Sequence, residues 1–154
     1  MSSSICLDSS VLIKILTWEE DSEQATELFK SILEKRQTIL LPDFACVEIG
    51  SVLRKKVYQK NIQPEEAEAL WDSFLNLNML KYIKSAKLME IAWLISIEDN
   101  LPVLYDAAYL AVAVSNSNEE NICQFWTADQ KLLNTVSVNK KYLMNIKDFS
   151  PQNA

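Results

Sequence analysis

Residues 5–16 are Ile5-Cys6-Leu7-Asp8-Ser9-Ser10-Val11-Leu12-Ile13-Lys14-Ile15-Leu16, and the rest of the chain repeats their pattern. The apolar run 5–7 predicts a buried strand that ends at Asp8, and the run from Val11 to Leu16 predicts a short helix directly after it. A strand that passes straight into a helix is the repeating unit of α/β proteins with a parallel sheet. The stretch therefore points to that class and leaves a carboxylate at the junction.

Strand and helix patterns alternate along the remaining sequence. Apolar runs predict further strands over 39–41, 80–83, 125–126 and 143–146. Helical periodicity and capping residues predict helices over 21–35, 43–60, 64–77, 85–98, 106–115 and 129–136. We therefore expect a three-layer α/β fold with a mainly parallel central sheet flanked by helices. Residues 1–150 are expected to form a single domain, followed by a short C-terminal tail at 151–154.

The composition removes several classes of function. Fifteen Lys and Arg against 21 Asp and Glu give a net charge of −6, which disfavours a protein that coats nucleic acid with a basic surface. His is absent from the sequence, so Ser-His-Asp and Cys-His catalysis and His-based zinc sites are excluded. The one glycine, Gly50, falls inside a predicted helix, which excludes a glycine-rich phosphate loop.

The cellular setting is predicted from the cysteines and the apolar runs. The three cysteines, Cys6, Cys46 and Cys123, are far apart in apolar settings, as buried reduced thiols are. No apolar run approaches the length of a membrane span, and the N-terminus lacks the basic start of a signal peptide. We therefore expect a cytoplasmic protein that does not enter a membrane.

Four carboxylates fall where predicted strands end or the next helices begin, which is the zone where parallel α/β sheets form their sites. They are Asp8, Glu48, Asp106 and Asp129. Three of them have a local alternative role. Asp8 and Asp106 can serve as helix N-caps, and Asp129 can stabilise the positive end of a helix dipole. Thr127 and Gln130 also fit a capping box around Asp129.

Glu48 is the hardest of the four to explain locally. Its neighbours at helical spacing are Phe44, Ala45 and Val52, and a carboxylate among apolar groups is costly unless paired or bound to a cation. Two carboxylate charges about 5 Å apart repel by ~3 kcal/mol at an effective dielectric of about 20, so a cluster would raise its own pKa values. A hard divalent cation relieves that repulsion, and oxygen ligands without His or thiolate suit Mg²⁺ or Mn²⁺.

Four segments resemble the PIN domain, a family of metal-dependent nucleases, and in particular its small VapC-type toxin ribonucleases. They are LDSSVLIK at 7–14, VEIGSVLR at 47–54 after Pro42, YDAAYLA at 105–111 and TADQKLL at 127–133. The resemblance covers nearly the whole chain and implies a PIN-like fold. It further implies an endoribonuclease that uses Mg²⁺ or Mn²⁺ to hydrolyse single-stranded or loop RNA, as the toxin of a type II toxin–antitoxin pair.

The resemblance also assigns residues and partners. It places Asp8, Glu48, Asp106 and Asp129 in catalysis and metal binding, and Thr127 beside the metal or its water. Many relatives have Asn two residues after the first acid, where this chain has Ser10. The family implies a cognate antitoxin, which we expect to enter the acid cluster through a basic segment whose Arg replaces the cation.

The sequence signals for phosphate contacts and for the oligomeric state are less specific than those for the acids. Lys14, Arg54 and Lys131 lie near the acid motifs and are candidate contacts to RNA, although a solvated surface role explains each equally well. Family members commonly form homodimers. The predicted helices over 67–77 and 88–97 carry large apolar side chains that fit either a dimer interface or the core. These side chains are Trp71, Phe74, Trp93 and Leu94.

Three other functions share part of this pattern. A PIN-like binding module without catalysis has little physical reason to keep unpaired acids together. Phosphotransfer proteins also place Asp after a strand, but the phosphatases need a second Asp at the position of Ser10. Receivers need a pair of acids after the first strand, where this chain has only Asp8. Flap-cutting DNA nucleases carry extra acids and helical arches, which 154 residues cannot hold.

Overall fold

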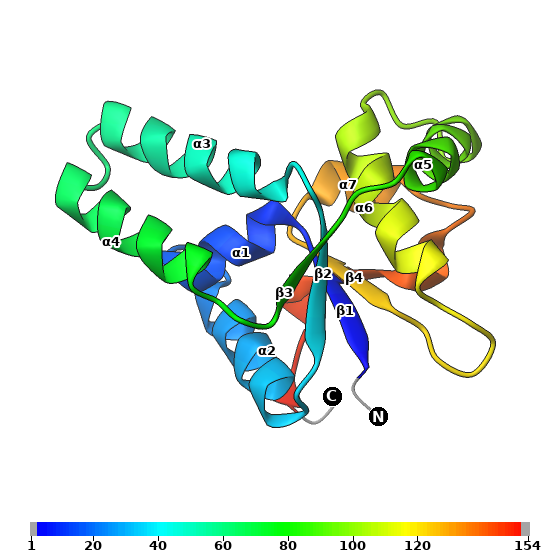
Figure 1. Ribbon diagram of the computed structural model, residues 1–154, viewed down its shortest axis with the longest axis horizontal. Coiled ribbons are helices and arrows are strands. Elements are labelled where there is room, and N and C mark those ends of the chain that lie inside the picture. Colours follow the sequence, from blue (N-terminus) through cyan, green and yellow to red (C-terminus); the bar gives the residue numbers. More distant parts are fainter. Residues whose placement is uncertain (1–2, 152–154) are drawn as a thin grey trace.

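The computed structural model describes residues 3–151, within which five parallel strands form one sheet in the order β3-β2-β1-β4-β5 (Figure 1). The strands are β1 (Ser4–Leu7), β2 (Thr38–Pro42), β3 (Leu80–Ile83), β4 (Gln124–Thr127) and β5 (Leu143–Asn145). Strand β1 lies at the centre, where Cys6 pairs with Leu40 on one side and with Phe125 on the other. The central strands are continuous apolar runs because helices cover both of their faces.

Two layers of helices enclose the sheet. They are α1 (Ser9–Leu16), α2 (Ser22–Glu34), α3 (Ala45–Tyr58), α4 (Pro64–Leu75), α5 (Ala86–Glu98), α6 (Leu104–Ser115) and α7 (Gln130–Thr135), with 3-10 turns at Lys140–Tyr142 and Ile146–Asp148. Helix α6 packs on β1, β2 and β4 and is covered by α5, whereas α1 and α2 lie on the other side of the sheet. Helices α3 and α4 pack along each other and project from the sheet as the α3–α4 arm (Figure 1).

Helix α6 is the most deeply buried helix of the described chain. All seven of its residues from Ala107 to Ala113 are buried. Four of the seven are alanines, whose small side chains let the helix approach the sheet closely, and a helix that is apolar all round is a core helix. Because the helix is packed in the core, the position of Asp106, which immediately precedes the buried run, is fixed as well.

The structure confirms the predicted three-layer α/β fold and places each predicted strand and helix within a few residues of its expected bounds. Cys6 and Cys123 are buried free thiols as expected, while Cys46 is half-buried. Within residues 3–151, no helix is long and apolar enough to cross a bilayer. Most of the predicted C-terminal tail, residues 152–154, lies outside the described part of the chain.

Two predicted helix starts are wrong in detail. Helix α6 begins at Leu104 with Val103 as its N-cap, so Asp106 lies inside the first turn and does not cap the helix. The capping box expected for Thr127 and Gln130 does not form, because Thr127 is the last residue of β4 and the cap of α7 is Asp129 itself. Both corrections matter for function, since they leave Asp106 and Thr127 without a local capping role.

Candidate active site

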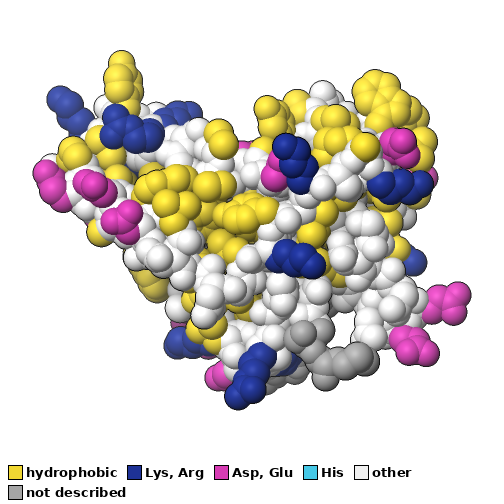
Figure 2. Space-filling model, in the orientation of Figure 1, with side chains coloured by type: hydrophobic (Ala, Val, Ile, Leu, Met, Phe, Trp, Pro, Cys, Tyr) yellow, Lys and Arg dark blue, Asp and Glu magenta, His cyan; other side chains and the backbone are white. Residues whose placement is uncertain are grey.

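The four predicted acids come from four different segments at the carboxyl end of the sheet. Asp8 follows β1, Glu48 and Asp106 lie in the first turns of α3 and α6, and Asp129 caps α7. From β1 the chain continues to β2 and β3 on one side of it, and then crosses to β4 and β5 on the other side. The strand order therefore reverses at β1, and open α/β sheets bind ligands at the carboxyl ends of the strands where such a reversal occurs. The surface is hollowed between the α3–α4 arm and the lobe that contains α5 and α6 (Figure 2).

Three of the four acids have raised pKa values, in part because of the charges of other acids in the set. Burial, together with the negative charges of the other three acids, raises the pKa of Asp106 to about 6. Burial and the charge of Asp8 likewise raise the pKa of Glu48. Among residues 3–151, none of the four acids forms an ion pair with Lys or Arg. The cluster therefore carries negative charge that the described chain does not compensate.

Asp8 is held through one of its two carboxylate oxygens. Its Oδ2 accepts hydrogen bonds of 2.7 Å from the Thr127 hydroxyl and 2.9 Å from the Ser10 hydroxyl. Burial raises the pKa of Asp8, and these two bonds oppose that effect. Asp8 occupies the N-cap position of α1, but its side chain makes no capping bond. Capping therefore does not account for this nearly buried carboxylate, whose Oδ1 meets only Ser9, at 3.5 Å.

The two hydroxyls also tie the ends of β1 and β4 together. The Thr127 oxygen accepts a 3.0 Å hydrogen bond from the backbone N–H of Asp129, and the Ser10 oxygen accepts one of 3.1 Å from Ala128. Each hydroxyl thus donates to Asp8 and accepts from the segment that carries Asp129. The Ser10 side chain therefore fills a structural role at this position.

Glu48 is positioned by Tyr109, a residue that the sequence prediction did not include in the site. The Tyr109 hydroxyl donates a 2.7 Å hydrogen bond to Oε1 of Glu48. The Tyr109 ring is buried, stacks in parallel on Phe125 at 5.4 Å and meets the edge of Phe44 at 5.7 Å. The available signal was its spacing three residues after Asp106, on the same helix face.

Asp129 shows the same division between its two oxygens. Its Oδ1 accepts the backbone N–H groups of Lys131 at 2.9 Å and Leu132 at 3.2 Å, which makes it the N-cap of α7. Within the described chain, Oδ2 of Asp129 and Oε2 of Glu48 have no hydrogen-bond partner, and Oδ1 of Asp8 accepts only the long 3.5 Å bond from Ser9. Three of the four acids thus have one oxygen anchored and the other left for a ligand.

The donor set fits a hydrated divalent cation. In the part of the chain that the structure describes, no three acidic or thiol side chains stand close enough together to enclose a metal ion. Mg²⁺, however, commonly keeps several waters and uses only one or two carboxylates directly. An open site in which oxygen ligands surround a partly hydrated ion therefore matches these carboxylates better than a closed cage.

Comparisons with known proteins identify the family. The model of the PIN domain matches residues 5–136, which span all four acids. This chain belongs to the PIN domain family. Among solved structures, the PIN domain resembles PAE2754 from Pyrobaculum aerophilum, with a TM-score of 0.66 and 20% identity over 96% of this chain and 92% of that one.

A second similar structure is VapBC2 from Rickettsia felis bound to a DNA fragment from their promoter, with a TM-score of 0.63 and 17% identity. That match covers 92% of this PIN domain and 98% of the other chain. No curated protein matches the sequence significantly. At these identities the two structures establish the fold of the PIN domain and not its chemistry.

Two cavities flank Asp129 in this PIN domain. The first, about 460 Å³, is called the Glu19 cavity here, and its polar lining comprises Ser9, Ser10, Lys14, Glu19, Lys56 and Asp129. The second, about 360 Å³, is called the Lys131 cavity and is lined by Asp106, Asp129 and Lys131 together with Leu101, Pro102 and Thr135. Two of the three predicted cations therefore border the acid cluster, one on each side of Asp129.

Arg54, the third predicted cation, lies elsewhere. It lines a separate cavity between α3 and α4 with Trp71 and Glu68, and none of the four acids takes part in that cavity. Arg54 is six residues beyond Glu48 on α3, which turns it to another face of the helix. The structure therefore does not bring Arg54 together with the other predicted site residues.

Proposed function

We propose that this PIN domain is an endoribonuclease that uses Mg²⁺ or Mn²⁺ to hydrolyse phosphodiester bonds of single-stranded or loop RNA. The observation that supports it most is the set of four carboxylates at one edge of the sheet, which have no cationic partner in residues 3–151. Burial and the charges of neighbouring acids raise the pKa values of three of them, Asp8, Glu48 and Asp106. Such a set is costly for a protein unless a divalent cation binds there. The PIN family, which comprises nucleases, supplies the reaction class.

In this proposal Asp8 and Asp106 hold the cation, and Glu48 and Asp129 assist directly or through water. When bound, the cation supplies Lewis-acid chemistry, in which it polarises the scissile phosphate and lowers the pKa of a water. Thr127 fixes the carboxylate of Asp8 so that Oδ1 faces the ligand, and Tyr109 does the same for Glu48. The expected products carry a 5′-phosphate and a 3′-hydroxyl, as in the family it resembles. Lys14 and Lys131 are proposed RNA contacts.

The decisive experiment compares Asp8→Asn with the wild type in cleavage of single-stranded RNA, with and without EDTA. Asn keeps the size of the side chain and can accept the Thr127 and Ser10 bonds through its amide oxygen, so the fold is expected to remain intact. Cleavage should be lost in the variant and in the wild type with EDTA, while Asp72→Asn, on the exposed face of α4, should cleave normally. Undiminished cleavage by Asp8→Asn would remove this residue from the site.

The same assay separates the competing functions. Flapped DNA offered beside the RNA tests a structure-specific DNA nuclease, and preferential cutting of the flap would overturn the RNA assignment. A stable phospho-aspartate trapped with a small phosphodonor would favour a phosphotransfer protein. Specific binding of RNA without any cleavage would favour a catalytically silent PIN-like module.

We further propose a role as the toxin of a type II pair in the cytoplasm, with an antitoxin that inserts a basic segment into the acid cluster. The fold is similar to VapBC2, which was solved bound to promoter DNA. An Arg side chain suits the uncompensated carboxylates because it donates two parallel hydrogen bonds. A neighbouring gene that encodes a small protein with a basic DNA-binding region, and that neutralises the nuclease, would support this role; a genome without one would oppose it.

A homodimer is proposed through α5. Trp93, Leu94 and Ile97 are each about 60% exposed on this helix, so the structure does not use them as core residues, whereas Phe74 of α4 is fully buried. Exposed apolar groups of this size are typical of an interface. Light scattering should report a dimer that Trp93→Lys converts to a monomer, and a monomeric wild type at micromolar concentration would contradict the proposal.

A further inference from the structure

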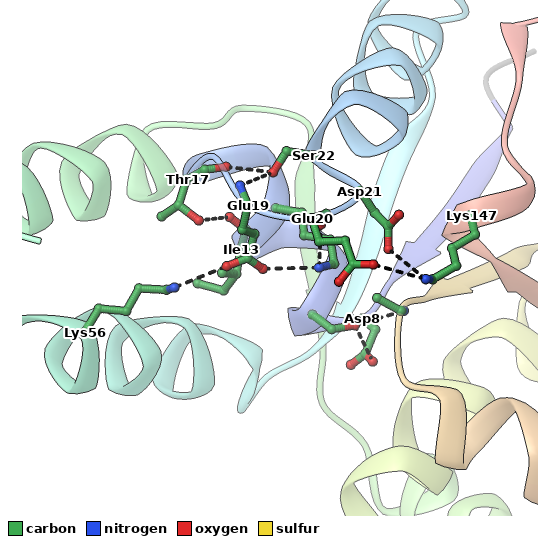
Figure 3. Close-up of polar contacts among 12 residues, drawn as sticks. Asp8, Ile13, Thr17, Glu19, Glu20, Asp21, Ser22, Lys56 and Lys147 are labelled. Atoms are coloured by element: carbon green, nitrogen blue, oxygen red, sulfur yellow. Dashed lines mark hydrogen bonds and ion pairs between the residues drawn. The ribbon is translucent and has the colours of Figure 1, made fainter. Parts of the chain in front are cut away.

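Two lysines from different helices meet on a single carboxylate in the Glu19 cavity. Lys14 of α1 lies 3.3 Å from Oε1 of Glu19, and Lys56 of α3 lies 3.2 Å from Oε2 of the same residue. Figure 3 shows Lys56 reaching from α3 toward Glu19. The two lysine side chains are only 12% and 22% exposed, which distinguishes them from freely solvated surface cations.

Glu19 is itself held in place by its own loop. Its backbone N–H donates a 2.8 Å hydrogen bond to the hydroxyl of Ser22, and that buried hydroxyl donates to the carbonyl of Thr17 at 3.1 Å. Lys14 adds a second bond, of 2.8 Å, to the carbonyl of Glu20. Burial by itself would raise the pKa of Glu19, but the hydrogen bonds and charges of Lys56 and Lys14 hold it below its ordinary value. The carboxylate therefore stays charged and keeps both lysines oriented.

The arrangement leaves positive charge and hydrogen-bond donors facing the cavity. The two ammonium groups and the carboxylate of Glu19 together carry a net charge of about +1, which Asp129 at the other end of the lining balances unless a cation binds there. Each ammonium has three donors, of which the bonds within the described chain use two on Lys14 and one on Lys56. The cavity that they line continues to Ser10 and Asp129, so it opens directly beside the carboxylate cluster. An anion there would contact the free donors without displacing Glu19.

We propose that Lys14 and Lys56, oriented by Glu19, form a subsite for a backbone phosphate of the RNA adjacent to the bond that is cut. This inference rests on the proposed nuclease function and adds to it a binding residue, Lys56, and a positioning residue, Glu19. A polyanionic strand that reaches the acid cluster passes the Glu19 cavity on one side of Asp129 and the Lys131 cavity on the other. The lysine pair draws the strand across the site and fixes where it is cut.

The chain offers two matched controls for Lys56. Lys55 precedes Lys56 on α3, is exposed and takes part in no ion pair found among residues 3–151. Lys147 also reaches an acidic loop, but it pairs with Glu20 and Asp21 on the other side of that loop, with half of its side chain exposed (Figure 3). Lys55→Gln and Lys147→Gln change the net charge by the same amount as Lys56→Gln and leave the cavity intact.

The test measures binding of a labelled single-stranded oligoribonucleotide to the full chain carrying Asp8→Asn, which blocks cleavage, over a range of salt concentrations. Lys56→Gln is expected to weaken binding about three- to tenfold. It should also make the negative slope of the logarithm of the association constant against log salt shallower by about 0.7, the value for one phosphate contact on a single strand. Lys55→Gln and Lys147→Gln should leave the slope unchanged. In the otherwise wild-type chain, Lys56→Gln should raise KM for cleavage more than it lowers kcat.

Glu19→Gln distinguishes positioning from simple attraction. This variant removes a negative charge, so attraction alone would make RNA bind more tightly. The proposal expects weaker binding and a lower salt slope, because the two lysines lose the group that orients them. Thermal unfolding midpoints measured on each variant confirm that the comparison concerns folded protein.

The outcomes separate this inference from the function on which it rests. If wild-type protein cuts RNA but Lys56→Gln behaves like Lys55→Gln, or Glu19→Gln binds RNA more tightly, the subsite is overturned while the nuclease stands. If the wild type neither binds nor cuts RNA, the proposed function fails and the subsite with it.

Discussion

The hydroxyl of Tyr109 donates a 2.7 Å hydrogen bond to Oε1 of Glu48 and so joins α6 to α3 across the candidate active site. Tyr109→Phe removes the bond but keeps the ring that stacks on Phe125. Because this bond opposes the raised pKa of Glu48, its loss should raise that pKa further. We expect cleavage to fall about three- to tenfold at neutral pH, equivalent to ~1 kcal/mol. The acid limb of the pH–rate profile should move to higher pH.

The pH profile is the informative measurement, because a purely structural loss would lower the rate equally at every pH. Unfolding in urea should show that Tyr109→Phe costs about 1 kcal/mol, the usual size of one hydrogen bond. Tyr58→Phe is the matched control, since Tyr58 is 88% exposed on α3. An unchanged pH profile in Tyr109→Phe would mean that Glu48 does not depend on this bond.

Thr127 allows a second test, because its hydroxyl donates to Asp8 and accepts from the backbone of Asp129. Thr127→Val keeps the shape but leaves the half-buried N–H of Asp129 and a carboxylate oxygen of Asp8 with fewer partners, which should cost about 1–3 kcal/mol of stability. Cleavage should fall at least tenfold, an estimate equivalent to ~1.4 kcal/mol. Thr127→Ser restores the hydroxyl and should recover most of both losses; equal defects in the Val and Ser variants would assign the effect to the methyl group.

The carboxylate cluster predicts that the metal-free protein gains stability on acidification. The pKa of Asp106 is raised from 3.8 to about 6, so its contribution to stability is fully present below about pH 4 and is lost as the pH rises through about 6. In EDTA, Asp106→Asn should therefore be more stable than the wild type at neutral pH by roughly 1–2 kcal/mol, allowing for solvent screening of this half-buried group. Near pH 4 the two proteins should unfold at the same urea concentration.

Divalent cations should reverse this difference. Mg²⁺ or Mn²⁺ binds the folded state, so its addition should raise the unfolding midpoint of the wild type at neutral pH and raise that of Asp106→Asn much less. Na⁺ at the same ionic strength controls for general screening. Equal stabilisation of both proteins by Mg²⁺ would place the cation outside the acid cluster.

The fold and the four acids were predictable for the same physical reason. Buried parallel strands are short apolar runs, and each run here ends close to a polar residue at a helix start, as Leu7 does before Asp8. The carboxyl ends of parallel strands share one edge of the sheet, so the acids that follow them converge whatever the exact helix bounds. Asp106 is the exception, because it follows α5 and not a strand; it reaches the cluster because α6 packs on β1, β2 and β4.

The partners of those acids were not predictable, since they depend on how helices rotate against one another. Thr127 fits a local capping box in the sequence, but its contact with Asp8, 119 residues away, replaces that box in the structure. The bond from Tyr109 to Glu48 requires the relative placement of α6 and α3, which no spacing encodes. Glu19 lies in a polar connection without any periodic pattern, so its two lysine partners were visible only in three dimensions.

Asp99 is a further buried acid whose role depends on tertiary contacts, and it supplies a prediction about stability alone. It is 2% exposed at the end of α5, and its carboxylate accepts the N–H groups of Ser137 at 2.8 Å and Val138 at 2.7 Å and the amide of Asn139 at 2.7 Å. Asp99→Ala should lower the free energy of unfolding by about 2–4 kcal/mol, because it leaves these donors without their charged acceptor. Cleavage per folded molecule should be unchanged, since the residue does not line either cavity beside the four acids.

Asp72→Ala, on the exposed face of α4, is the control and should lose less than about 0.5 kcal/mol in the same urea titration. A similar loss in both variants would show that the three bonds to Asp99 do not hold the segment after α7 against α5.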